Sequence, residues 1–164
     1  MNTEGSIKKY KVCSECGAWC CKGFDYVNWY VRYSLRDIVR ICGKYNISIE
    51  KFLEKYVHLI DQGTYSIPVI KAIDGKCPFL RGTTCTIHDV KPIACRVFPV
   101  RPPGQSYDER CPLSRYPELL VEEEQLIPIY VREHIETEVL LCEKRVKSIR
   151  DLYEVIRSLM LGTF

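Results

Sequence analysis

Two groups of cysteines constrain this chain more than any other feature of its sequence. They hold eight of the ten cysteines: Cys13, Cys16, Cys20 and Cys21 near the start, then Cys77, Cys85, Cys95 and Cys111. Thiolate is a soft ligand that favours zinc, copper(I) and iron–sulfur clusters, and a Cys-x-x-Cys loop brings two sulfurs onto one ion with little strain. We therefore predict that the two groups meet in space and bind metal through these eight thiolates.

The spacing of the cysteines leaves the number of metal sites open. Eight thiolates match two four-ligand sites, or one cluster with additional redox-active thiols. Neighbouring side chains tend to diverge, so Cys20 and Cys21 could serve different sites or different edges of one site. Gly17 and Gly23 allow the positive φ angles that turn backbone N–H groups toward sulfur in the first loop. His88, within the second group, is a candidate ligand or a hydrogen-bond donor to a ligand.

A disulfide framework is the alternative to a metal site. Residues 1–10 lack the apolar segment of a secretory signal peptide, which indicates a cytoplasmic protein. The reducing cytosol disfavours disulfides, except in hyperthermophiles. No apolar run approaches the roughly 20 residues of a membrane span, so we also expect no association with a membrane.

Positive charge is concentrated around the second cysteine group. The formal net charge is +3, and the segment 76–110 holds six Lys and Arg against three Asp and Glu, which accounts for the whole excess. A basic stretch is one mark of a nucleic-acid-binding protein. However, four thiolates around Zn²⁺ or a [4Fe-4S]²⁺ core leave a net charge of about −2, which nearby cations would offset. We therefore expect a redox or protein partner and not nucleic acid.

The residue patterns predict a small α+β fold, mostly helical, with a few short strands and a C-terminal helical extension. We expect a cysteine-rich metal-binding domain over residues 1–115, with the C-terminal helices of residues 116–164 packed on it. β-branched and aromatic runs predict strands, whereas capping residues followed by apolar residues at helical spacing predict helices. Strands are expected over 25–33 and within 64–73, with an edge or bulge at Pro68, and helices over 35–45, 49–60, 118–147 (restarted at Pro128) and 149–161.

Four further side chains are predicted to be structural. Cys42 and Cys142 fall on the apolar faces of predicted helices, so we expect both to be buried core residues and not ligands. His58 is predicted on the surface of the helix over 49–60. Trp19 lies within the first ligand loop and is predicted to shield the metal site.

The ordered motifs are similar to those of the CxxCxxCC (YkgJ-type) family of zinc- or iron-chelating proteins. The likeness covers residues 10–115, although the spacing after Cys16 differs by one residue from the family's name. The resemblance implies a ligand role for the eight cysteines named above, and one related branch, flagellin lysine N-methylase, implies an iron–sulfur centre. The motifs are Cys13-x-x-Cys16-x-x-x-Cys20-Cys21, Cys77-Pro-Phe-Leu, Cys85-x-Ile-His88 and Lys91-Pro92-x-x-Cys95-Arg96-x-Phe98-Pro99.

Two functions from different classes fit these residues. The first is a protein that holds an iron–sulfur cluster for electron transfer, or as an accessory to a redox or protein-modifying enzyme. The second is a structural zinc-binding interaction module without catalysis. Zinc sites commonly pair two short Cys-x-x-Cys knuckles, whereas the second group here is spaced by 7, 9 and 15 intervening residues, which favours the cluster. The chain has no glycine-rich nucleotide loop, and its status as an enzyme is left open.

Overall fold

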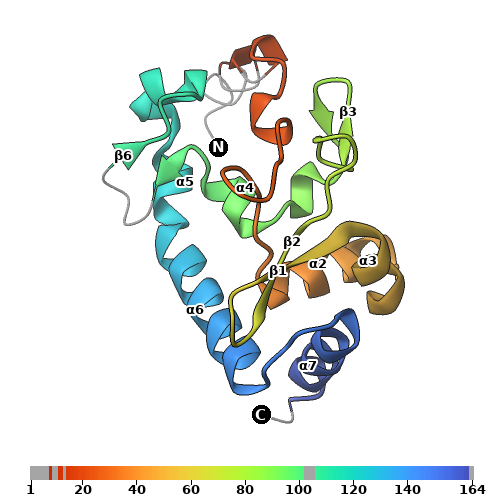
Figure 1. Ribbon diagram of the computed structural model, residues 1–164. Coiled ribbons are helices and arrows are strands. Elements are labelled where there is room, and N and C mark those ends of the chain that lie inside the picture. Colours follow the sequence, from red (N-terminus) through yellow and green to blue (C-terminus); the bar gives the residue numbers. More distant parts are fainter. Residues whose placement is uncertain (1–7, 9–10, 13, 102–105, 163–164) are drawn as a thin grey trace.

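The computed structural model describes residues 8, 11–12, 14–101 and 106–162 of the chain (Figure 1). As predicted, the fold is α+β, with helices and, among the described residues, three separate antiparallel strand pairs, β1–β2, β3–β4 and β5–β6. In chain order the elements are η1 (Trp19–Cys21), α2 (Leu35–Tyr45), α3 (Ile49–Tyr56), β1 (Val57–Asp61), β2 (Ser66–Ile70), β3 (Leu80–Arg81), β4 (Thr84–Cys85), η2 (His88–Val90), α4 (Ile93–Val97), β5 (Val100–Arg101), β6 (Ser106–Tyr107), η3 (Pro112–Arg115), η4 (Pro117–Leu119), α5 (Val121–Gln125), α6 (Ile127–Glu143) and α7 (Ile149–Leu161).

Helices α2 and α7 confirm the prediction from the capping signals. Each begins with a complete capping box. The Ser34 or Ser148 hydroxyl accepts a hydrogen bond from the backbone N–H of Asp37 or Asp151, and the carboxylate of that aspartate accepts one from the backbone N–H of the serine. Helix α2 ends at Tyr45 and is followed by Asn46, whose φ of 49° is a left-handed conformation that asparagine tolerates. Both helices bury an apolar face, and Cys42 lies in the core as expected.

The strand predicted over residues 25–33 is wrong. Asp25 instead organises a loop, because its carboxylate accepts hydrogen bonds from the backbone N–H groups of Val27, Asn28 and Trp29. Such a local bond competes with strand pairing. The end of the segment runs beside β2 through two backbone bonds, from Tyr33 N–H to the Pro68 carbonyl and from Ile70 N–H to the Val31 carbonyl.

The helix predicted over residues 49–60 is correct only for its first half. Helix α3 ends at Tyr56, and residues 57–61 form β1, which pairs with β2 over five residues from Val57↔Ile70 to Asp61↔Ser66. Strand β2 is buried throughout and pairs with β1. The spacing of apolar residues alone does not predict this pairing between distant residues. His58 therefore lies on strand β1 and not on a helix. Its ring contacts the Tyr26 ring at a centroid distance of 4.4 Å.

Two apolar cores lie at different ends of the molecule. The larger core includes α2, α3, β2 and α7, and the smaller one gathers α4, β5, η3 and the start of α6. In Figure 1, α5 lies on the left and α4 near the centre, both above α2, α3 and α7. None of the described helices is long and apolar enough to cross a membrane.

Helix α6 joins the two cores, with Ile127 in the smaller one and Leu141 in the larger one. Pro128 stands at its start and separates it from α5, as predicted. The buried face between these ends is polar: Glu133 accepts from Ser34 Oγ at 2.9 Å, and Thr137 Oγ1 accepts from Leu35 N–H at 3.0 Å. This helix therefore docks on the N-terminal end of α2 through hydrogen bonds.

The prediction that Cys142 is a core residue is wrong. Cys142 lies exposed near the end of α6, while its neighbour Leu141 is buried. The helix carries apolar residues on more than one face, so apolar spacing could not tell which face would be buried.

His134, on the buried face of α6, predicts a loss of stability below neutral pH. Burial lowers the pKa of His134 from 6.5 to about 4, and both ring nitrogens lack a hydrogen-bond partner among the described residues. The folded state resists protonation while the unfolded state accepts it, so stability is lost as the pH falls from about 6.5 to about 4. At pH 5 the loss should be about 2 kcal/mol.

The His134→Leu variant tests this expectation by urea unfolding at pH 7 and pH 5. We expect the wild type to lose about 2 kcal/mol more than the variant between these values. Any pH-dependent step shared by the two proteins cancels in this comparison. The exposed His58 provides the control, because His58→Gln should follow the wild type. Equal losses in the wild type and His134→Leu would contradict the prediction.

Candidate metal centre

The first cysteine group reaches the second through backbone pairing beside η1. Gly17 and Gly23 have φ of 68° and 73°, as predicted for this loop. The Cys21 carbonyl accepts a hydrogen bond from Cys77 N–H at 2.8 Å, and Lys22 forms a bridge with Lys76. These bonds join segments more than fifty residues apart and place Cys21 beside Cys77.

A tight hairpin then returns the chain from Cys77 to Cys85. Strands β3 and β4 pair Leu80 with Cys85, and the Thr86 N–H and hydroxyl both donate to the Phe79 carbonyl, at 2.8 and 3.0 Å. Gly82, at the turn, has φ 60°. Because the hairpin is short, Cys85 comes back toward the first cysteine group.

Interactions between neighbouring thiols shift the pKa values of Cys20 and Cys21. Cys20 interacts with Cys21, and Cys21 interacts with Cys77. The interaction with Cys21, together with burial, raises the pKa of Cys20 far above its usual value. For Cys21, the interaction with Cys20 lowers the pKa, but the interaction with Cys77 and burial outweigh it and raise the pKa to about 12.

Cys85 and Cys95 complete this group of thiols. Burial raises the pKa of both, and each interacts electrostatically with Cys20. Lys91 interacts with Cys20, Cys85 and Cys95, and it lowers the pKa of each thiol. We call Cys20, Cys21, Cys77, Cys85 and Cys95 the thiol group. Lys91 is thus a cation of the kind that we expected beside a thiolate centre.

The thiol group fits a soft metal in its ligand chemistry. Repulsion between nearby thiolates adds to burial in raising the pKa values of Cys20, Cys21, Cys85 and Cys95, and a bound cation would remove that repulsion. Among the described residues, no three His, Cys, Asp or Glu side chains are arranged to hold a metal ion. The chain therefore brings the donors together without forming a closed coordination sphere.

The other predicted ligands lie elsewhere or outside the described residues. Cys111 is 8% exposed in the smaller core, where it follows the Asp108 turn and precedes η3. Cys16 lies in the turn before η1, and His88 is the first residue of η2. Cys13 lies outside the described residues. The assignment of all eight cysteines as ligands stays a prediction.

An aromatic clamp, which the sequence did not reveal, connects the first loop to the segment before Cys111. The Arg110 guanidinium carbon lies 4.8 Å from the Trp19 ring and 4.9 Å from the Trp29 ring, and these rings are 5.0 Å apart. The Arg110 guanidinium also donates two hydrogen bonds to Asp108, at 2.9 and 2.7 Å. Trp19 therefore holds the polypeptide next to Cys111 and does not simply cover a metal.

Asp37 connects α2 to the helix that carries Cys95. Its buried carboxylate accepts from Ile93 N–H at 2.8 Å, at the start of α4, and from Ser34 N–H at 2.8 Å. It also pairs with Arg40. A helix of five residues has little stability of its own, so this contact fixes the position of Cys95.

The chain belongs to the CxxCxxCC family, described as a "Putative zinc- or iron-chelating domain", whose sequence model matches residues 12–113. The match confirms the predicted resemblance but does not bear on the flagellin lysine N-methylase branch. Searches of curated proteins and of solved structures each found no match. The cysteines among the described residues are free thiols in this structure.

Proposed function

We propose that this protein holds an iron–sulfur cluster through Cys thiolates and serves in electron transfer, or as an accessory to a redox or protein-modifying enzyme. The thiol group carries the proposal. Residues of the thiol group come from three separated parts of the chain. The bond from Cys77 N–H to the Cys21 carbonyl, at 2.8 Å, joins two of these parts, and Cys85 and Cys95 interact electrostatically with Cys20. Four of them would provide the thiolates that a cluster needs.

The surroundings of the thiol group suit a redox centre. Cys77 is 7% exposed, and the fully buried Tyr33 lies close enough to Cys77 and Cys95 to interact electrostatically with both. Burial raises the pKa of the Tyr33 hydroxyl well above its usual value, so this group adds no negative charge. Exclusion of water and the positive charge of Lys91 are both factors that set a cluster's reduction potential.

An absorption spectrum of protein purified without oxygen, with iron, zinc and labile sulfide measured on the same sample, tests the proposal. We expect a broad band at roughly 400 nm with matching iron and sulfide, as for thiolate-bound clusters. Reduction with dithionite should bleach the band reversibly. A colourless protein with stoichiometric zinc would overturn the redox proposal.

A structural zinc site is the second candidate, and the thiol group's position favours it independently. The described elements between residues 77 and 101 are only two to five residues long. A metal shared by Cys20 or Cys21 and the later cysteines would cross-link this segment to the rest of the fold. In that case removal of zinc by a chelator should unfold the segment 77–101 without any redox signal, as amide hydrogen exchange would report.

A further inference from the structure

Helix α6 buries polar residues and exposes apolar ones. Its inward face carries Glu133, His134 and Thr137, each 7% exposed or less. Its outward face carries a row of exposed residues that we call the outer seam: Pro128, Val131, Ile135, Val139 and Cys142. Ile135 and Val139 are 59% and 48% exposed. A helix that is apolar on its outer side is usually covered by a partner.

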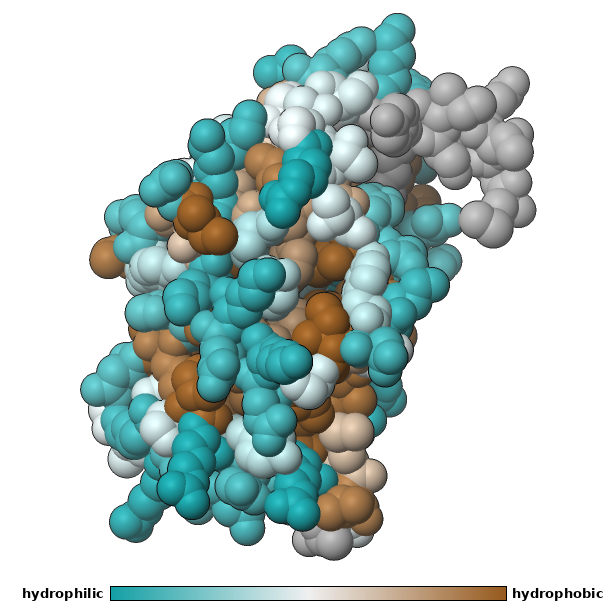
Figure 2. All heavy atoms as spheres, turned by 90° about the vertical axis from the view of Figure 1, so that its right-hand side faces the viewer, coloured by the Kyte–Doolittle hydropathy of each residue, from teal (hydrophilic) through white to brown (hydrophobic). Residues whose placement is uncertain are grey.

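No described segment covers the outer seam. Helix α6 runs along the left edge of the molecule in Figure 1, with the other helices on its inner side. A shallow hollow lies over its N-terminal half, lined by Pro128, Val131, Arg132 and Ile135. On the face seen in Figure 2, by contrast, hydrophobic side chains are interspersed among hydrophilic ones.

The spacing of the outer seam is symmetric about Ile135. Successive members are 3, 4, 4 and 3 residues apart, which is the spacing of helix pairs that pack side by side. If a second copy of α6 lies antiparallel across a two-fold axis at Ile135, Val131 faces the partner's Val139. Pro128 likewise faces the partner's Cys142. The spacing of the outer seam is therefore the same in both directions along the helix, so two copies can pair in opposite directions, as a two-fold interface between identical subunits requires.

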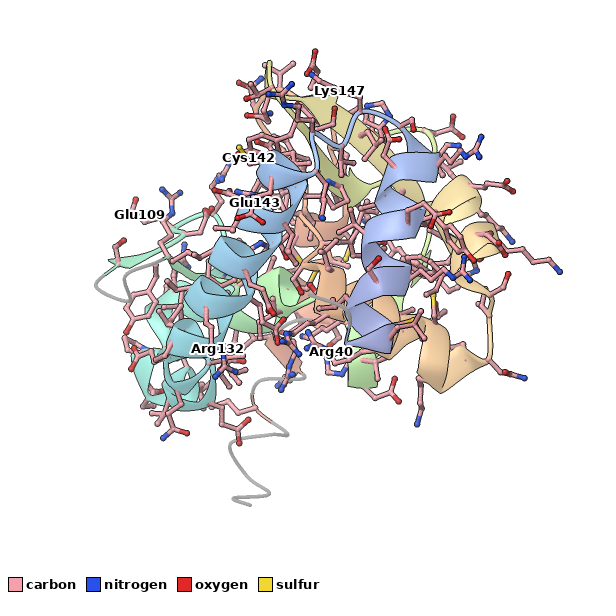
Figure 3. The ribbon with its side chains drawn as sticks, turned by 90° about the horizontal axis from the view of Figure 1, so that it is seen from below. Arg40, Glu109, Arg132, Cys142, Glu143 and Lys147 are labelled. Atoms are coloured by element: carbon pink, nitrogen blue, oxygen red, sulfur yellow. The ribbon has the colours of Figure 1, made fainter. Side chains whose placement is uncertain are left out.

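The charges beside the seam favour the same arrangement. Arg132, Glu136 and Glu143 lie along one flank of α6, and Figure 3 shows Arg132 and Glu143 toward opposite ends of the helix. In the two-fold antiparallel pair this flank faces the same flank of the partner, so Arg132 lies about 3 Å along the helix axis from the partner's Glu136. Glu136 also pairs with Arg36 of its own subunit, at 2.7 Å. Arg132 is exposed and makes no salt bridge within the described residues, so its charge is available for this contact.

We propose that the outer seam of α6 binds the same seam of a second copy of this chain, in an antiparallel, two-fold symmetric dimer. The proposal does not depend on which metal the protein holds, because the interface lies on α6 and not on the cysteine-rich segments. Burial of Ile135 and Val139 supplies the apolar centre, and Arg132 with the partner's Glu136 forms its charged edge.

Sedimentation equilibrium over a wide range of concentration tests the proposal. We expect a monomer–dimer equilibrium, with Kd at least about a hundredfold weaker in Ile135→Glu, because two like charges then meet at the axis. Val139→Glu is a second variant in case the first fails to fold. Val27→Glu is the matched control, since Val27 is 80% exposed and is not part of α6, and it should dimerise like the wild type. A monomer at all concentrations, or a dimer unaffected by both seam variants, would overturn the proposal.

Cross-linking tests the orientation. In the antiparallel dimer the two Cys142 thiols are about 21 Å apart along the helices, since each residue rises about 1.5 Å. A short bifunctional maleimide should therefore join the introduced thiol of Pro128→Cys to the partner's Cys142, as peptide mass mapping would show. The double variant Pro128→Cys with Cys142→Ser should lose that product. A link between two Cys142 side chains in the wild type would overturn the antiparallel arrangement.

Discussion

Replacement of Cys85 or Cys95 by serine is expected to release the metal and destabilise the fold. Both thiols lie in the thiol group, on separate elements β4 and α4. Serine keeps the shape of the side chain but removes the soft thiolate. Groups that only support a ligand are worth 10- to 100-fold in metal affinity, so loss of the ligand itself should cost more than about a hundredfold. Metal content and the thermal midpoint, measured together, report the effect.

The matched control for these variants is Cys142→Ser. It makes the same chemical change at a cysteine that is exposed on α6, away from the thiol group, so metal content should stay at the wild-type value. The change in stability should be within about 0.5 kcal/mol, as for surface positions in general. Full metal content in both Cys85→Ser and Cys95→Ser would remove these residues from the ligand set.

The substitution Asp37→Ala should cause the largest loss of stability, about 3–5 kcal/mol, as for other broken buried ion pairs. The carboxylate is completely buried and accepts from the backbone N–H groups of Ser34 and Ile93, besides its pair with Arg40. Alanine leaves these donors unpaired in the interior, which is costly. Since Ile93 begins the helix of Cys95, we also expect weaker metal binding.

Two further substitutions test whether the loss of stability comes from the unpaired backbone donors or only from the lost negative charge. Asp37→Asn keeps one carbonyl oxygen as an acceptor, so its loss should be smaller than that of alanine. Glu136→Ala removes a carboxylate, 32% exposed, that pairs with Arg36 between the same two helices, at 2.7 Å. Surface pairs of this kind contribute about 1 kcal/mol or less. Urea unfolding of the metal-loaded proteins should give the order Asp37→Ala, Asp37→Asn, Glu136→Ala, and equal losses in all three would contradict the assignment.

The parts of the fold that could be predicted from sequence are those held by local hydrogen bonds. The capping boxes at Ser34 and Ser148 fix the starts of α2 and α7, because donor and acceptor lie three residues apart in the chain. The turn at Asp74-Gly75 is local as well, and both residues have positive φ. The strand predicted over 25–33 failed at Asp25, where a local side-chain bond replaced strand pairing.

For the candidate site, too, local sequence predicted one part and long-range contacts decided the other. Cysteine spacing predicted the donors, and the family match over residues 12–113 supports a zinc- or iron-chelating role. The spacing could not predict which cysteines lie together, because the bond between Cys21 and Cys77 depends on pairing across more than fifty residues. Nor could it predict that Cys111 would pack in the smaller core, near the clamp made by Arg110.

The sequence by itself determined the family of this protein, the candidate cysteine ligands, and the helices whose starts are capped within one turn. The tertiary structure decided which of these residues meet. Residues 57–61 became a strand because β2 lies beside them, and α6 turned Glu133 inward because Ser34 and Arg40 there satisfy its carboxylate. With the Glu133 face of α6 turned toward the interior, Ile135 and Cys142 are exposed. Long-range hydrogen bonds and burial, which depend on the whole chain, outweighed the local pattern at these positions.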